Sequence, residues 1–115
     1  MDCKSPKSLS DFYIRMLGWE KTYEDDGFIV ISSSLCDVRI GFQKNSDYVP
    51  PVWPEIQNAQ QQQVHLDFRA RDKEHMKCMV EHAIECGAIK AKEQYSDLWT
   101  VMIDPAGHPF CFDTL

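Results

Sequence analysis

Histidine is the side chain best suited to proton transfer and metal binding near neutral pH, because its unperturbed pKa lies close to 6.5. The chain has four histidines. His75 and His82 are seven residues apart and lie off the apolar stripe of a predicted helix, so both are expected to face solvent. His65, in "VHLDFRA", is the histidine that could act as a base or bind a ligand oxygen. The alternative is that His65 is a hydrogen-bonded histidine with no chemical role.

The fourth histidine belongs to "DPAGHPF", which has the residues of a tight turn. Asp104 can accept hydrogen bonds at the start of the turn, Pro105 presets its φ angle, and Gly107 permits a left-handed step. Pro109 stands at the entry of the next strand, where a missing N–H is tolerated. The pattern therefore predicts His108 to be a turn residue rather than a catalytic one.

The number and spacing of the cysteines limit the roles that these residues can have. Their count is odd and no CxxC pair occurs, so the pattern predicts neither a disulfide framework nor a structural zinc knuckle. Free and mostly buried thiols are expected, since a free cysteine packs as a small apolar residue. The five are Cys3, Cys36, Cys78, Cys86 and Cys111.

Two helices and seven strands are predicted to position these side chains. The first helix begins at its cap Ser5 and ends at Gly18, with a buried stripe of Leu9, Phe12, Tyr13, Met16 and Leu17. The second begins at its cap Asp72 and ends at Gly87, with a stripe of Met76, Met79, Val80, Ala83 and Ile84. Strands are predicted at residues 21–24, 28–33, 37–43, 64–70, 89–95, 99–104 and 110–114.

The same pattern of elements occurs twice. The two helices match with an offset of 67 residues, for example Leu9 with Met76, and farther on the offset is about 70, which pairs Ile40 with Phe110. The chain is therefore predicted to be α+β, with a strand–helix–strand–strand–strand unit used twice and both helices on one face of the sheet. We predict one domain over residues 1–115, made of module one (1–45), a linker (46–62) and module two (63–115). No chemistry is assigned to the glutamines at 60–63, which we interpret as solvated linker.

Four motifs occur in a recognisable order: "SPKSLSDFYIRMLGW", "VPPVWP", "QQVHLDFRARD" and "DPAGHPFCF". Together with the repeat, they resemble the vicinal oxygen chelate superfamily, which includes glyoxalase I, bleomycin-resistance proteins and extradiol dioxygenases, over nearly the whole chain. The resemblance implies two βαβββ modules that form a curved mixed sheet around a cavity, with the helices on the outer face. It is specific for the fold and not for the activity, because this scaffold hosts many chemistries.

The resemblance also implies where a metal would bind: on the first and last strands of each module. His65 matches the first-strand position of module two, and Cys111 stands where metal-bearing relatives carry Glu. In module one the last-strand position is Gly41, and the first-strand position would lie upstream of Met1, so we expect a clipped first strand. His65 is then the only conventional ligand position retained. No metal cofactor is therefore predicted, with a divalent metal as the alternative.

Alternation along the strands divides the side chains between the helix face and the cavity face. We expect Leu66, Phe68, Ala70, Val38, Ile40, Phe42, Phe110 and Phe112 to face the helices. The predicted ligand-binding residues of the cavity wall are His65, Asp67, Arg69, Arg39, Gln43 and Cys111, with Trp53 as an apolar addition. Such a wall suits a small polar or anionic ligand. The alternatives are an ion pair of Asp67 with Arg69, and core filling or linker anchoring by Trp53 and Trp99.

Composition limits the partners. The formal net charge is −6, which argues against nucleic acid, since its binders usually carry a basic patch. No apolar run approaches the roughly 18 residues of a membrane-spanning helix, and "MDCKSPK" has no apolar signal region. We therefore expect a cytoplasmic protein with no nucleic-acid or membrane partner. The resemblance implies a small-molecule ligand and a possible homodimer, because related proteins often form homodimers.

Three functions remain open at this point. The first is a metal-free protein of the glyoxalase/bleomycin-resistance type that binds a small molecule in its cavity. The second is a metal-dependent lyase or dioxygenase of the superfamily, although glyoxalase I activity itself is not expected, because its metal ligands and carboxylate base are missing. The third is a domain whose surface serves protein assembly.

Overall fold

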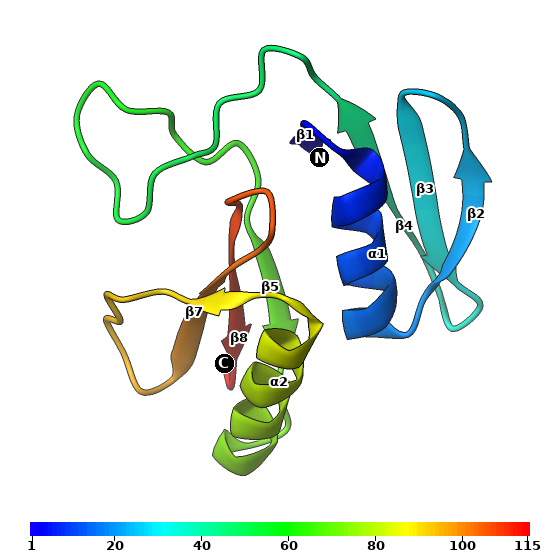
Figure 1. The fold of residues 1–115 in the computed structure, drawn as a ribbon. Coiled ribbons are helices and arrows are strands. Elements are labelled where there is room, and N and C mark those ends of the chain that lie inside the picture. The colour runs from blue at the N-terminus through cyan, green and yellow to red at the C-terminus, as the bar shows by residue number, and fades with distance from the viewer. The chain divides into compact units, whose positions relative to one another are not determined.

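Two units make up the fold in a computed structural model that describes all 115 residues. They are Met1–Val49 and Pro50–Leu115, and each contains one helix and a four-stranded mixed sheet (Figure 1). The order strand–helix–strand–strand–strand occurs in both, which confirms the predicted α+β class and the βαβββ repeat. The boundary lies inside the predicted linker, 46–62, which contains no helix or strand.

The N-terminal unit consists of β1 (Asp2–Cys3), α1 (Pro6–Leu17), β2 (Glu20–Glu24), β3 (Phe28–Ser33) and β4 (Cys36–Lys44). The sheet order is β1-β4-β3-β2, with β1 parallel to β4 and the other pairs antiparallel. Strands β2 and β3 form a hairpin that turns at Asp25-Asp26-Gly27, where one carboxylate oxygen of Asp25 accepts the N–H groups of Gly27 and Phe28 at 2.8 Å.

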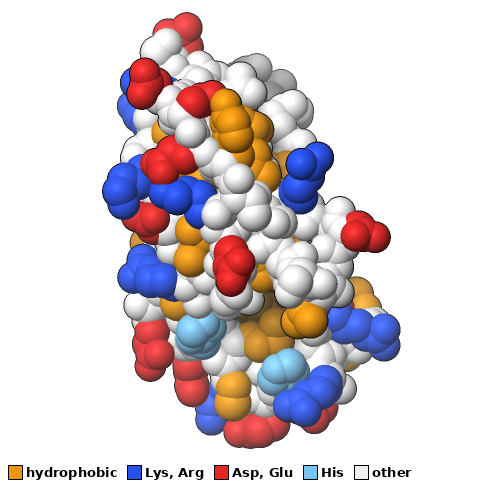
Figure 2. All heavy atoms as spheres, turned by 90° about the vertical axis from the view of Figure 1, so that its right-hand side faces the viewer, with side chains coloured by type: hydrophobic (Ala, Val, Ile, Leu, Met, Phe, Trp, Pro, Cys, Tyr) orange, Lys and Arg blue, Asp and Glu red, His pale blue; other side chains and the backbone are white.

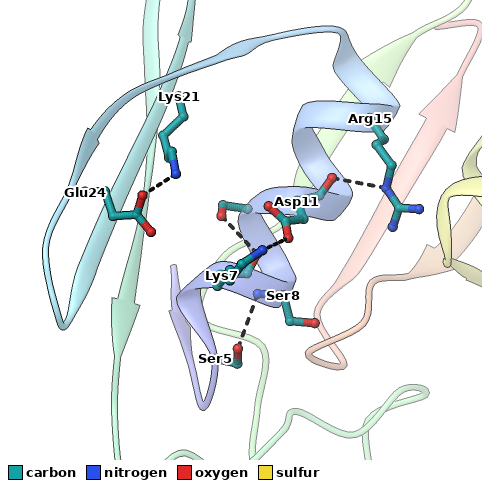
Figure 3. Close-up of polar contacts among 8 residues, drawn as sticks. Ser5, Lys7, Ser8, Asp11, Arg15, Lys21 and Glu24 are labelled. Atoms are coloured by element: carbon teal, nitrogen blue, oxygen red, sulfur yellow. Dashed lines mark hydrogen bonds and ion pairs between the residues drawn. The ribbon is translucent and has the colours of Figure 1, made fainter.

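Helix α1 begins and ends as the sequence predicts. The Ser5 side chain accepts a hydrogen bond from the Ser8 N–H at 3.2 Å, and Gly18 closes the helix in the left-handed region with φ of 68°. Figure 3 shows this cap together with the Lys7–Asp11 ion pair one turn along the helix. Both features are exposed, so we attribute the stability of α1 mainly to its buried face.

That buried face packs on β3 and β4. Leu9, Phe12 and Tyr13 are almost completely buried, and the Tyr13 ring stacks on Phe42 of β4 with 5.5 Å between centroids. The prediction that Val38 and Phe42 of β4 both face the helix holds only in part. Phe42 is buried, whereas Val38 lies at the hairpin end of the strand and is 58% exposed. Only the C-terminal half of β4 therefore buries its helix-facing side chains.

The C-terminal unit consists of β5 (Leu66–Arg69), α2 (Lys73–Cys86), β6 (Ile89–Lys90), β7 (Trp99–Ile103) and β8 (Pro109–Asp113). The order is β5-β8-β7-β6, with β5 parallel to β8 and the remaining pairs antiparallel. Helix α2 is capped by Asp72, whose carboxylate accepts the His75 N–H at 2.7 Å, and it ends at Gly87. Its buried residues are Met76, Ala83 and Cys86.

Two predictions for this unit were wrong in part. Ile84 was assigned to the buried stripe of α2 and is 48% exposed, because the stripe continues from Ala83 to Cys86 instead. The predicted strand 89–95 ends at Lys90. Beyond Lys90, the side-chain amide of Gln94 donates to the carbonyl oxygens of Ala91 and Val101 and accepts the Val101 N–H. The side chain of Gln94 thus makes hydrogen bonds to β7 where a continued strand would have made them with its backbone.

The repeat is also visible in strand register. Asp2 pairs with Gln43 in the first sheet, and Arg69 pairs with Asp113 in the second. These are equivalent pairs under the offsets of 67 and 70 residues that the sequence predicts. The parallel pairing covers two residue pairs in the first unit and four in the second.

The surface carries both signs of charge. On the face shown in Figure 2, acidic and basic side chains are interspersed, and neither sign gathers into one continuous patch. Neither helix has the length and apolar character that crossing a membrane would require.

Candidate functional site

Strand β8 has a different environment on each of its two faces. Phe110 and Phe112 point to one face, where they pack with Phe68 of β5 at centroid distances between 5.5 and 5.9 Å. Cys111 and Asp113 point to the other face, since successive side chains alternate. All five residues of β8 are buried, so the second face is also covered.

A cavity of about 310 Å³ lies over this second face, and every residue that lines it belongs to the C-terminal unit. Its size is at the lower end of the usual range for ligand pockets. Three aromatic rings form much of the wall, and Trp53 meets Tyr95 edge to face at 6.2 Å. The aromatic lining residues are Trp53, Tyr95 and Trp99; Val101 and Leu115 are aliphatic; His65, Asp67, Cys111 and Asp113 are polar.

His65 is held at both ring nitrogens. Nδ1 lies 2.9 Å from Oε1 of Gln62, and Nε2 lies 3.2 Å from Sγ of Cys111. Because an amide oxygen only accepts hydrogen bonds, Nδ1 carries the proton and Nε2 presents its lone pair to the thiol. The Cys111 S–H therefore donates to His65.

The thiol of Cys111 is protonated at neutral pH. Burial, and to a smaller degree the negative charges of Asp67 and Asp113, raises the pKa of this thiol to about 11. The pair of Cys111 and His65 is thus a neutral hydrogen-bonded pair rather than a thiolate–imidazolium pair. A nucleophilic role for Cys111 is disfavoured in this state, since the thiolate is the reactive form.

Three possible metal ligands converge at the same place. One ligand atom each from His65, Asp67 and Cys111 lies within 4.8 Å of the others, and Oδ1 of Asp67 is 3.6 Å from Nε2 of His65. The Gln62 contact orients the imidazole, as hydrogen bonds to the ring nitrogen that does not bind the metal orient histidines in metal sites. Nitrogen, oxygen and sulfur donors with a further open position fit a catalytic Zn²⁺ or a similar borderline metal. These residues therefore fit a metal once Cys111 loses its proton.

A family model described as a glyoxalase-like domain matches residues 1–112. The chain belongs to this family. The match confirms the resemblance seen in the sequence, and it covers both units. No curated protein sequence matches the chain significantly.

Solved structures show that other glyoxalase-like proteins share the fold. A glyoxalase/bleomycin resistance protein/dioxygenase family enzyme from Burkholderia phytofirmans PsJN matches with a TM-score of 0.74 and 18% identity over 99% of this chain and 93% of its own. A possible glyoxalase from Bacillus cereus matches with a TM-score of 0.71 and 11% identity, covering 98% and 92%. A glyoxalase-related enzyme from Fulvimarina pelagi matches with 0.70 and 12%, covering 100% and 84%. At these identities the similarity concerns the fold alone.

The predicted site residues of this glyoxalase-like domain fall into two groups. His65, Asp67, Cys111 and Trp53 line the cavity of the C-terminal unit. Arg69 follows Asp67 by two residues on β5; both side chains are exposed, but only Asp67 is part of the lining. Arg39 and Gln43 are exposed on β4 of the N-terminal unit. The wall of the cavity in the C-terminal unit is therefore less polar than predicted, because aromatic side chains stand beside the polar ones.

Gly41, the last-strand position of module one, is covered by an aromatic ring. A Cβ built on Gly41 would lie 2.6 Å from Cζ and 2.9 Å from Cε2 of Phe28. Phe28 and Gly41 lie on adjacent strands, where Gly41 pairs with Val30. The space for a ligand side chain at this position is thus taken by the Phe28 ring.

Sequence reasoning missed the polar residues Asp113, Gln62 and Tyr95 of the site, as well as the aliphatic Val101 and Leu115. Asp113 could have been found, because it follows Cys111 by two residues on the same strand face. Gln62 belongs to the glutamine run to which no chemistry was assigned, and only its contact with His65 distinguishes it. Tyr95 lies in the segment wrongly predicted as strand, where no periodicity points to the cavity.

The "DPAGHPF" turn does not take part in the cavity lining. Its Asp104 carboxylate accepts the N–H groups of Ala106 and His108 at 2.9 and 3.0 Å, and Gly107 adopts φ of 92°. His108 is 5% exposed and lies within the turn, as predicted. His108 is therefore a buried residue of the turn that does not line the cavity.

A second hollow of about 330 Å³ occurs in the N-terminal unit, around the start of α1. Its lining combines three lysines with three acidic side chains, so opposite charges balance one another there. They are Lys4, Lys7, Lys44, Glu24, Asp25 and Asp26. The cavity of the C-terminal unit, which joins apolar rings to converging polar groups, is the better candidate site.

Proposed function

We propose that this glyoxalase-like domain binds a small organic molecule in the cavity of its C-terminal unit, and that the binding requires no metal. The observation that carries the proposal is the lining itself: three aromatic side chains together with four polar ones around about 310 Å³. Aromatic walls supply most of the contact area in small-molecule sites, while a few polar groups fix the orientation of the ligand.

Tryptophan fluorescence offers a direct test. The chain has three tryptophans, of which Trp53 and Trp99 line the cavity and Trp19 does not. In a Trp19→Phe variant, the emission reports mainly on the cavity. A library of small organic compounds should contain binders that quench or shift this emission in the presence of a chelator and raise the midpoint of thermal unfolding.

Variants locate the binding. Trp99→Ala should abolish the response to a binder, whereas Trp19→Phe should leave its affinity unchanged. Mass spectrometry of the purified protein under native conditions provides a second readout, since a ligand that co-purifies appears as added mass. A protein that binds no library compound and carries no added mass would contradict the proposal.

A metal-dependent lyase or dioxygenase is the second candidate, favoured by the convergence of His65, Asp67 and Cys111 within 4.8 Å. When bound there, a divalent metal would supply Lewis acidity toward oxygen atoms of a substrate. The protein's own contribution would be to hold the imidazole through Gln62 and to release the thiol proton of Cys111, whose pKa of about 11 a nearby cation would lower.

Cobalt titration separates the two candidates. Binding of Co²⁺ at this site should produce a thiolate charge-transfer band and release a proton, and Cys111→Ala should remove both signals. Cys78→Ala is the matched control, because Cys78 is exposed on α2. If Co²⁺ gives no such band with the native protein, the metal-dependent candidate is refuted while metal-free binding stands.

A further inference from the structure

The charge of the cavity lining is one-sided. It contains the carboxylates of Asp67 and Asp113 and no lysine or arginine. Asp113 is only 8% exposed, and its Oδ1 accepts the Leu115 N–H at 3.0 Å. None of the four ion pairs in the structure includes Asp113. Burial removes water from around a carboxylate, so a positive charge placed in the cavity would be attracted to Asp113.

Arg69 is the residue of the chain best placed to compensate Asp113, and it does not do so. The register of β5 and β8 sets the two residues opposite each other. The Arg69 side chain nevertheless remains exposed and forms no ion pair with Asp113. No positively charged side chain of the protein therefore pairs with Asp113, and a cation bound in the cavity would be its nearest positive charge.

An anionic ligand would be repelled by the carboxylates of Asp67 and Asp113, because no positively charged side chain lines the cavity. The small anionic ligand considered from the sequence is thus disfavoured, and the two arginines that suggested it are absent from the lining.

The aromatic residues of the wall favour a particular kind of cation. Trp53, Tyr95 and Trp99 line the same cavity as the two carboxylates. Ring faces attract cations, and the attraction is largest for tryptophan and for cations with a weak hydration shell. A metal ion would seek oxygen, nitrogen and sulfur ligands, whereas an alkylated ammonium gains from both the rings and the carboxylates.

We propose that the cavity of the C-terminal unit selects a small organic cation, an alkylated ammonium group whose charge is compensated by Asp113 and Asp67 and whose alkyl groups contact Trp53, Tyr95 and Trp99. This inference rests on the proposed function, because it names the class of ligand that the cavity binds. It differs from a metal site in that neither His65 nor Cys111 is required for the charge compensation.

Choline and its neutral isostere, 3,3-dimethylbutan-1-ol, provide the test. They have nearly the same shape and differ in charge. Both are titrated into the native protein in the presence of a chelator, with calorimetry and tryptophan fluorescence as readouts. Choline should bind roughly tenfold or more tightly than the isostere, as expected for cation–aromatic and charge contacts together.

Variants assign the charge effect to the site. Asp113→Asn should reduce choline affinity about tenfold and leave the affinity for the isostere nearly unchanged. Glu81→Gln removes an exposed carboxylate of α2 outside the cavity lining and should change neither affinity. Since the comparison of the two ligands uses the native protein, it remains decisive even if Asp113→Asn fails to fold.

Each outcome supports or overturns the inference. Equal affinity for choline and the isostere would show that charge contributes nothing, which overturns the inference and leaves the proposed function standing. If neutral or anionic library compounds bind but choline does not, the cation inference is likewise overturned and the proposed function stands. If no compound of any charge binds, the proposed function itself fails, and the cation inference fails with it.

Discussion

Replacing Gly41 by alanine tests the interpretation that the Phe28 ring occupies the last-strand position of module one. The new Cβ would lie 2.6 Å from Cζ and 2.9 Å from Cε2 of Phe28. Carbon atoms in ordinary contact are about 3.5–4.0 Å apart, so the ring must move by about 1 Å. The ring is bounded by Tyr23, whose centroid is 6.4 Å away, and such a movement disturbs the packing of β2 on β3.

The expected loss follows from two opposing contributions. Overpacking of this kind reduces the free energy of unfolding by about 1–3 kcal/mol. The lower flexibility of alanine in the unfolded chain returns roughly 0.5 kcal/mol. The net loss of about 0.5–2.5 kcal/mol corresponds to a decrease of roughly 2–10 °C in the midpoint of thermal unfolding for a chain of this size.

Circular dichroism during heating measures this change, with Gly27→Ala as the matched control. A Cβ on Gly27 meets no atom within 4 Å, and neither glycine has φ in the left-handed region. Gly27→Ala should therefore leave the midpoint nearly unchanged, and Phe28→Leu should relieve part of the loss in a Gly41→Ala background. If Gly41→Ala unfolds at the same temperature as Gly27→Ala, the Phe28 ring does not restrict this position and the interpretation is refuted.

Three more predictions concern stability and thiol reactivity. The folded protein keeps the Cys111 proton up to a pKa of about 11, whereas the unfolded chain loses it near 9.0. The free energy of unfolding should therefore fall by on the order of 1–2 kcal/mol as the pH rises between these values. Chemical denaturation at several pH values measures this decrease, which should be absent in Cys111→Ala. Asp72→Ala removes the acceptor of the His75 N–H and should destabilise the protein by about 1 kcal/mol in urea unfolding, whereas Asp72→Asn, which keeps an acceptor oxygen, should be nearly neutral. Native alkylation followed by mass spectrometry should modify the exposed Cys36 and Cys78 first and the three buried thiols only on unfolding, and rapid labelling of Cys111 at neutral pH would contradict the structure.

The features that the sequence predicted are those that depend on local periodicity. Caps such as Ser5 and Asp72 and the face alternation on β5 and β8 come from neighbouring residues, and the structure confirms them. The pairs Asp2–Gln43 and Arg69–Asp113 are equivalent under the offsets of 67 and 70 residues, so the strand register agrees with the repeat that the sequence predicted. Repetition constrains register because both modules build the same parallel strand pair.

The features that the sequence did not predict depend on side chains from segments without periodicity. Tyr95 reaches the cavity from a stretch in which Gln94 substitutes for strand backbone, and no pattern in the sequence signals such a substitution. Gln62 looked like solvated linker, although its side chain orients His65. The sequence also could not show that Arg69 is absent from the cavity lining, because alternation places it on the same strand face as Asp67, which does line the cavity.

The turn between β7 and β8 determines which side chains of β8 line the cavity. Asp104 holds the turn through the N–H groups of Ala106 and His108, and the turn sets Pro109 opposite Ile103. Side chains alternate along β8, so a slip of one residue would exchange Cys111 and Asp113 with their phenylalanine neighbours. The lining of the cavity therefore depends partly on a turn that contributes no residue to it. A one-residue change in the length of that turn would place the phenylalanines in the cavity and Cys111 and Asp113 in the core, without altering any residue of the strand.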